Sequence, residues 1–387
     1  MEQHGKATDI LAKYIIIAAF TVLIGSLCWY FRDIISYILI AAVLSLVGRP
    51  LMDLICKISI KGKRPPQWLA AILAILLLFS IFILVITLIV PVVTNVLKDV
   101  SKVNVGETVK AISVPLQKFN DFLIDKFPAL GRNFKIENAV FEHIQNIFDV
   151  SIISSAISSV TSIVANTGIA LFSVVFISFF FFKDGDLFSR IISSLVPDKH
   201  EANAKAAIGD ISALLTRYFL GLLLEIAGVA LLNFIGLLAI ARMGFSASIG
   251  IAFITGIMNI IPYVGPMVGG AIGTVLAVIM KYVCATHLGA DVSFWVFILI
   301  VVAIFCFTQI IDNYIFQPLI YSNSIKASPL EIFIIMLMAG KLGGMLGMLI
   351  AIPSYTAVRV IAGRFFRNVK FIRELIPDPS EDKNESK

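Results

Sequence analysis

Long apolar segments recur along the whole chain, and they constrain its fold more than any other feature. Each is about long enough, at roughly 1.5 Å per residue, to cross the roughly 30 Å hydrocarbon core of a bilayer. They cover Tyr14–Phe31, Ile34–Ile55, Trp68–Leu97, Ile163–Phe182, Leu214–Ile240 and Phe294–Ile311. Only 14% of the residues are charged, whereas soluble domains carry about 25%. The sequence therefore predicts an all-α, polytopic membrane protein.

Two further apolar stretches in the last third of the chain are interrupted by Gly and Pro. Residues 249–280 are interrupted at Pro262–Pro266, and residues 330–361 at Gly340–Gly344. In lipid every backbone N–H and C=O needs a partner, so irregular backbone occurs only where protein or a water-filled cavity surrounds it. Paired interrupted segments are typical of transport sites. We therefore expect about eight membrane segments in all.

The interruptions allow two arrangements. Leu330–Ala339 would span about 15 Å as a helix, roughly half of the hydrocarbon thickness. In one arrangement both stretches form re-entrant helical hairpins, and in the other each crosses once as an interrupted helix. The spacing of Gly and Pro favours the hairpins, because it is more typical of chain reversal than of a kink.

The charge distribution predicts an orientation. Lys and Arg are in excess over residues 49–64 and again over residues 359–373. Because cytoplasmic loops carry such an excess, both termini should be cytoplasmic. We expect the membrane to be a bacterial inner (plasma) membrane. We expect the first three membrane segments within residues 1–97 and extracytoplasmic amphipathic helices within residues 98–157. Residues 158–241 should hold membrane segments four and five, with a cytoplasmic helix at 186–213 between them. Residues 242–365 should form the transport region with its interrupted helices, and residues 366–387 a polar cytoplasmic tail.

Ionisable residues inside the expected membrane segments have a functional and a structural interpretation. Glu225 lies about ten residues into its segment, where a carboxylate needs a partner or water. It is a candidate ion-coupling site, or else it makes a structural hydrogen bond. Asp312 is a second candidate, or else an interfacial cap. Lys341 would neutralise an anionic substrate, pair with an acidic residue, or extend to the membrane surface.

The candidate substrate-binding residues belong to the two interruptions and to the polar run between them. They are Asn259, Pro262, Gly265, Pro266, Gln309, Asp312, Asn313, Gln317, Gly340, Lys341, Gly343 and Gly344. Small residues at the spacing of Gly340, Gly343, Gly344 and Gly347 are typical of close helix packing in membranes. Together with the amphipathic helices, they lead us to expect a homo-oligomer.

Sequence motifs for catalysis are missing. The chain contains no phosphate-binding P-loop, no HExxH and no GxSxG motif. Its four cysteines form no CxxC pair. We therefore expect no enzyme activity, no cofactor and no metal, and we attribute the net charge of +6 to membrane orientation rather than to nucleic-acid binding.

Several motifs resemble those of the autoinducer-2 exporter family. The run Phe179–Gly185 resembles its FFxKDG signature, and Asn259–Pro266 resembles its IPYxGP motif. Asp312–Pro318 and Gly340–Pro353 resemble its C-terminal block, and the likeness covers about residues 10–365. Lys341 departs from the pattern, because an uncharged residue is expected there. The resemblance implies a transporter of eight spans. The family that it resembles includes exporters of autoinducer-2 and sodium/proton antiporters.

Three functions remain open on the sequence. One is export of a small polar solute such as autoinducer-2, with Asn259, Asn313 and Gln317 as uncharged ligands. The second is cation/proton antiport, which needs a titrating carboxylate such as Glu225 or Asp312. The third is a membrane scaffold without transport, assembled through its external helices.

Overall fold

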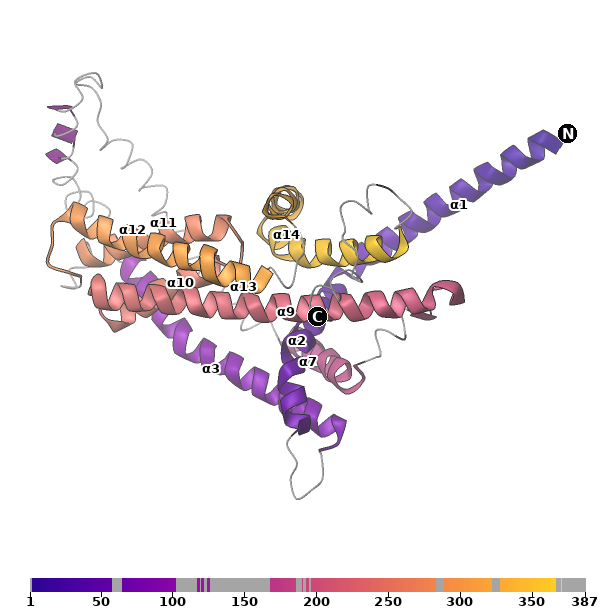
Figure 1. The fold of residues 1–387 in the computed structure, drawn as a ribbon, viewed down its shortest axis with the longest axis horizontal. Coiled ribbons are helices and arrows are strands. Elements are labelled where there is room, and N and C mark those ends of the chain that lie inside the picture. The colour runs from indigo at the N-terminus through magenta and orange to yellow at the C-terminus, as the bar shows by residue number, and fades with distance from the viewer. Residues whose placement is uncertain are drawn as a thin grey trace, which may run out of the picture. The chain divides into compact units, whose positions relative to one another are not determined.

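The computed structural model describes residues 2–57, 65–101, 117–118, 120–121, 124–125, 168–185, 190, 193–194, 196–282, 289–321, 328–366 and 370. All regular structure within these ranges is helical, which confirms the predicted fold class (Figure 1). The helices are α1 (Glu2–Tyr30), α2 (Arg32–Lys57), α3 (Gln67–Ser101), α7 (Gly168–Lys183), α9 (Asp198–Ile235), η2 (Gly236–Ile240), α10 (Phe245–Met258), α11 (Val264–Tyr282), α12 (Phe294–Ile311), η3 (Asp312–Phe316), α13 (Gln317–Tyr321) and α14 (Pro329–Phe365).

Many of these helices have the length and composition of membrane spans. Among the described residues, six helical segments are long and apolar enough to cross a bilayer: Arg32–Lys57, Gln67–Val85, Asp198–Ile240, Val264–Tyr282, Phe294–Leu319 and Gly347–Phe365. Shorter apolar helices cover Tyr14–Tyr30, Gly168–Lys183 and Phe245–Met258. The chain is therefore a multi-pass membrane protein. Nearly all of the amphipathic region expected at 98–157 lies outside the described residues.

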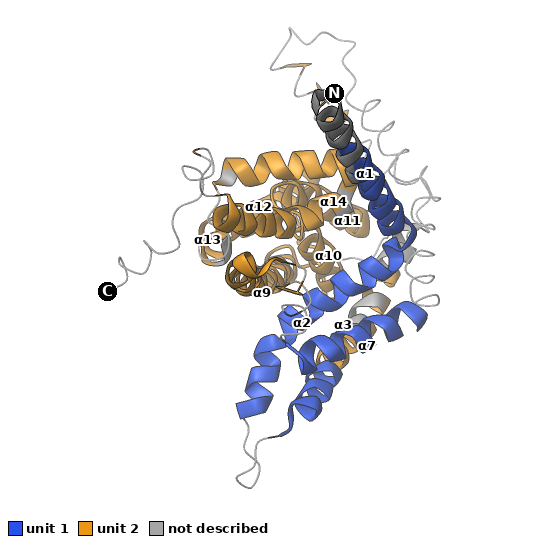
Figure 2. Ribbon diagram, turned by 90° about the vertical axis from the view of Figure 1, so that its right-hand side faces the viewer, with its two compact units in different colours: residues 1–77, 167–190 blue, residues 78–166, 191–387 orange. Residues whose placement is uncertain are grey.

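The chain divides into two compact units, coloured separately in Figure 2. The first comprises residues 1–77 and 167–190. In it α2 and α7 pack side by side, and the Ser178 hydroxyl donates to the carbonyl oxygen of Ala41 at 3.5 Å. Both residues are fully buried. Small residues at this contact let the two backbones approach closely.

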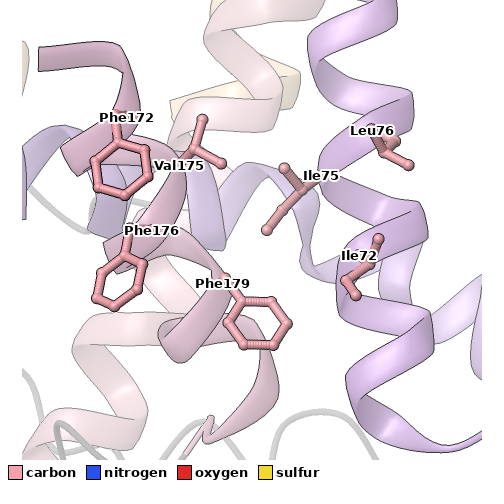
Figure 3. A pocket seen from close by; sticks show the side chains of 7 residues that line it. All are labelled: Ile72, Ile75, Leu76, Phe172, Val175, Phe176 and Phe179. Atoms are coloured by element: carbon pink, nitrogen blue, oxygen red, sulfur yellow. The ribbon is translucent and has the colours of Figure 1, made fainter. Parts of the chain in front are cut away.

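An apolar pocket of about 300 Å³ lies between α3 and α7 within the first unit (Figure 3). Its lining residues are Ile72, Ile75, Leu76, Phe172, Val175, Phe176 and Phe179. All of these side chains are hydrocarbon, so none can direct a hydrogen bond at a bound polar group. The pocket therefore lacks the few polar groups that orient a small polar ligand.

The second unit, residues 78–166 and 191–387, is built along α9. Helices α10, α12, α13 and α14 all contact α9, which is the longest helix of this group in Figure 1. The sequence predicts a polar helix at 186–213 followed by a separate span from Leu214. The structure instead has a single helix of 38 residues from Asp198 to Ile235. No proline occurs in this range, so the change from polar to apolar composition does not interrupt the helix.

The first interrupted stretch folds as an antiparallel hairpin of α10 and α11. The chain reverses between Asn259 and Tyr263, and Tyr263 has a left-handed backbone with φ of 66°. Gly265 follows, where an added Cβ would lie 1.9 Å from the carbonyl oxygen of Met258. Only glycine permits this approach of the two helices.

The second interrupted stretch also reverses. In α14 the helix breaks at Gly344, with φ of 58° and ψ of −141°. A Cβ on Gly347 would overlap the carbonyl oxygen of Ala339, which shows that the two legs lie side by side. Both stretches thus reverse direction as helical hairpins; whether they are re-entrant stays a prediction. The first leg begins at Pro329, with the Ser328 hydroxyl capping it, and is longer than the ten residues expected.

Candidate functional site

One face of α9 is buried and carries polar groups among apolar ones. Its buried residues include Tyr218, Leu222, Glu225, Val229 and Asn233. They recur every three or four residues, so they form a single stripe along the helix. A carboxylate and an amide on a buried stripe need polar partners, because each would otherwise lose its hydration without compensation.

Glu225 receives a hydrogen bond from the first hairpin. The side chain of Glu225 is 1% exposed, and Asn259 is 2% exposed. Asn259 caps the C-terminus of α10 and its Nδ2 donates to Glu225 Oε1 at 3.4 Å. The sequence singled out both residues for different roles, and the structure brings them together. Their contact couples the chain reversal of the hairpin to the carboxylate.

A second polar pair lies further along the same two helices. Asn233 Nδ2 donates to Thr255 Oγ1 at 3.0 Å, and both side chains are buried. Neither residue was among the sequence-predicted site residues. The available signal was the position of Asn233, which lies two turns after Glu225 on the same face of the helix. Its partner could be identified only from the register of α10 against α9.

Asp312 is the centre of a separate network at the end of α12. It is fully buried, and its Oδ2 accepts from Gln309 Nε2 at 3.2 Å and from Gln317 Nε2 at 3.0 Å. The same two amides donate to Asn313 Oδ1 at 3.1 and 3.0 Å. The structure therefore joins all four predicted residues of this run in one network. Asp312 begins η3, a π-helix, and such segments are frequent at functional sites.

Helix α9 connects these polar groups. An added Cβ on Gly228, one turn after Glu225, would lie 2.7 Å from the Phe316 ring of η3. An added Cβ on Gly236 would lie 2.4 Å from Ile304 of α12. Both positions require glycine because the neighbouring side chain occupies the space. The carboxylates of Glu225 and Asp312 are thus carried by helices in direct contact.

The reversal of the first hairpin packs against α9 and both legs of α14. The buried residues of this cluster are Tyr218, Leu222, Ile261, Ile332, Met336, Ala351 and Ile352. Pro262 and Gly265 are buried and Pro266 is partly exposed. The ring of Tyr263 meets that of Phe333 edge to face at 6.0 Å. The predicted residues of the first interruption therefore lie at the junction of three elements.

The second interruption is more exposed. Lys341, Gly343 and Gly344 are exposed at the reversal of α14, whereas a Cβ on Gly340 would meet the side chain of Met348 in the other leg. The spacing of Gly340 and Gly347 is thus explained by packing within the hairpin. Lys341 is exposed, whereas Glu225 and Asp312 are buried. Among the described residues no group of three His, Cys, Asp or Glu could hold a metal ion.

Comparison with known proteins agrees with this architecture. The family model described as "AI-2E family transporter" matches residues 15–367. The chain is 28% identical over 341 residues to "Putative transport protein YueF" of Bacillus subtilis (strain 168), covering 86% of this chain and 83% of that protein. It is 26% identical to "Putative transport protein YrrI" of the same organism, covering 57% and 58% of the two chains.

A relative from another organism shows the same relationship over a shorter range. "Putative transport protein MT0215" of Mycobacterium tuberculosis (strain CDC 1551 / Oshkosh) is 23% identical over 246 residues, which is 61% of this chain and 62% of that protein. The family match extends over nearly all of the helices described above, including both hairpins and the buried polar stripe of α9. The chain therefore belongs to the AI-2E transporter family.

Proposed function

We propose that this protein is a secondary transporter that exports a small polar solute such as autoinducer-2 across a bacterial inner membrane. The observation that carries the proposal is the buried stripe of α9, where Glu225 and Asn233 face the first hairpin. Polar groups inside a membrane segment are rare and occur along substrate or ion pathways. The amides of Asn259, Gln309 and Gln317 are uncharged, which suits a hydroxylated solute. The membrane type and the cytoplasmic placement of both termini belong to the same proposal.

Cation/proton antiport is the second candidate. It is favoured by the burial of two carboxylates, since Glu225 is 1% and Asp312 0% exposed. The Asn259 amide donates to Glu225, and the Gln309 and Gln317 amides donate to Asp312. An amide stabilises a carboxylate without fixing its charge as strongly as an Arg or Lys would. Each carboxylate can then exchange a proton for a cation during a cycle.

Flux measurements in proteoliposomes test both candidates. The purified full chain is reconstituted with autoinducer-2 inside, and efflux is followed with and without sodium and proton gradients. The wild type and the Glu225→Gln and Asp312→Asn variants are compared. Solute efflux in the wild type supports the exporter. Proton movement driven by sodium alone, and lost in the two variants, supports antiport.

The same experiment can reject transport. Absence of both solute and proton movement, in vesicles shown to contain folded protein, would contradict the proposed function. It would favour the third function considered from the sequence, a scaffold assembled from several copies. Cross-linking in native membranes then measures whether the protein forms the homo-oligomer that we expect.

A further inference from the structure

The orientation of the Asn233 amide follows from its hydrogen bonds. The Thr255 hydroxyl donates its hydrogen to the carbonyl oxygen of Ala252 at 3.0 Å. The oxygen of that hydroxyl can therefore only accept from Asn233, so the NH₂ group of Asn233 faces Thr255. The carbonyl oxygen Oδ1 of Asn233 points elsewhere. It is buried and accepts no hydrogen bond from any described residue.

Helix pairing alone does not explain this free oxygen. A Ser or Thr at position 233 would bond across the helices without burying an unpaired carbonyl, which is unfavourable. A group outside the described residues that donates to Oδ1 would satisfy it. The amide at this position thus has the chemistry of a ligand-binding group as well as that of a helix contact.

Two other candidate site residues present the same kind of atom. Asn259 Oδ1 and Asp312 Oδ1 are also buried without a hydrogen bond from the described part of the chain. Asn259 uses its NH₂ group for Glu225, and Asp312 uses its other oxygen for Gln309 and Gln317. All three free atoms are acceptors. A solute that meets them must bring hydrogen-bond donors or positive charge.

We propose that Asn233 is a second substrate-contacting position on the transport path, and that the path selects donor-rich or cationic solutes against anions. This inference rests on the proposed transport function. Eight residues of helix place Asn233 about 12 Å from Glu225 along α9, which is too far for one small solute to occupy both positions at once. The solute therefore contacts the two residues in succession.

Two matched variants separate ligand contact from helix pairing. Asn233→Leu removes both the bond to Thr255 and the free oxygen, whereas Thr255→Val removes the same bond and leaves the oxygen. Both are reconstituted as full chains, and initial rates are measured against concentration for autoinducer-2 efflux and for sodium-driven proton movement. Asn233→Leu should raise the half-saturating concentration about tenfold for the transported species, as expected for a lost ligand hydrogen bond of roughly 1.4 kcal/mol. Thr255→Val should stay close to the wild type.

The outcomes distinguish this inference from the transport proposal. Equal effects of the two variants would show that Asn233 only pairs the helices, and would leave the transport function in place. Movement of acetate as fast as that of the donor-rich or cationic solute would overturn the selection against anions. Absence of any wild-type flux would refute the proposed function and this inference with it.

A third variant keeps the proposal testable if Asn233→Leu does not fold. Asn233→Asp loses the NH₂ donor but keeps an acceptor oxygen and adds a negative charge, so it should bind a cationic solute at least as tightly as the wild type and should not weaken the binding of a donor-rich neutral solute tenfold. The proposal would be contradicted if a folded Asn233→Asp protein had a tenfold higher half-saturating concentration both for the cation and for the neutral solute. In the wild type, autoinducer-2 efflux would identify a neutral solute, and sodium-driven proton movement would identify a cationic one.

Discussion

Asn259 donates its side-chain amide to Glu225, which precedes it by 34 residues and lies on another helix. The donor sits where α10 ends and the chain reverses. Any change in the hairpin reversal therefore changes the environment of the most buried acidic side chain of α9. This contact gives the hairpin a direct physical connection to the proposed coupling residue.

The first prediction concerns this hydrogen bond. Asn259→Ala should lower the free energy of unfolding by about 1–3 kcal/mol, because it leaves a buried carboxylate with one donor fewer. Thermal unfolding of the detergent-purified protein measures the change. The double variant with Glu225→Gln should recover part of the loss, since a neutral amide tolerates burial better. Equal unfolding temperatures for Asn259→Ala and the wild type would show that this bond does not support the fold.

The second prediction concerns the close approach at the first reversal. Gly265→Ala should prevent folding, because its Cβ would lie 1.9 Å from the carbonyl oxygen of Met258. Gly343→Ala is the control, since a Cβ there has no atom within 4 Å. Size-exclusion chromatography of both variants measures the yield of monodisperse protein. A normal yield of Gly265→Ala would mean that the reversal has another backbone path.

The third prediction concerns the base of the second hairpin. The Tyr355 hydroxyl donates to Glu331 Oε2 at 2.6 Å, and Arg359 Nη1 lies 3.3 Å from the same oxygen. Tyr355→Phe should lower the free energy of unfolding by about 0.5–1.5 kcal/mol, the usual contribution of one such bond. Tyr314→Phe, at a position that is 79% exposed, should leave it unchanged. A thermal unfolding scan compares the two, and similar losses in both would argue against a role for the bond.

The fourth prediction concerns orientation. The backbone N–H groups of Gly289 and Ala290 donate to the carbonyl oxygens of Arg242 and Ala241 at 2.9 and 2.8 Å, so residues 289–290 lie at the end of the bundle where α9 and η2 finish. A cysteine replacing Asp291 should react with a membrane-impermeant reagent added to whole cells. A cysteine replacing Lys205, in the polar part of α9, should react only after the membrane is opened. The reverse pattern would place both termini outside the cytoplasm. A background lacking the four native cysteines removes competing labelling.

Sequence reasoning identified the hairpins because Gly and Pro have strong local effects. Pro262 and Gly265 predict chain reversal without knowledge of any neighbour, and Gly344 takes a backbone angle that favours glycine. Glu225 was also identifiable, because a carboxylate in an apolar segment is costly wherever its partners lie. These features depend on the residue itself.

The sequence alone could not predict which side chains on different helices contact one another. The pairing of Asn233 with Thr255 depends on the register between α9 and α10, which packing at Gly256 and its neighbours determines. The network of Asp312 depends on η3, because a π-helix turns each residue less than an α-helix does and so changes which side chains meet. The full length of α9 was not predicted for a simpler reason. The composition changes from polar to apolar along this segment, but the helix continues through the change.

Helix α9 is unbroken from Asp198 to Ile235, and in its polar N-terminal half the Asp210 carboxylate accepts from Arg364 Nε at 2.9 Å. A continuous helix transmits displacement along its axis as a stiff rod does. The ion pair of Asp210 and the carboxylate of Glu225 therefore cannot move independently. In the transport cycle that we propose, the surroundings of Glu225 change either because the hairpins move past a stationary α9 or because α9 moves as a whole and carries its contact with Arg364 along.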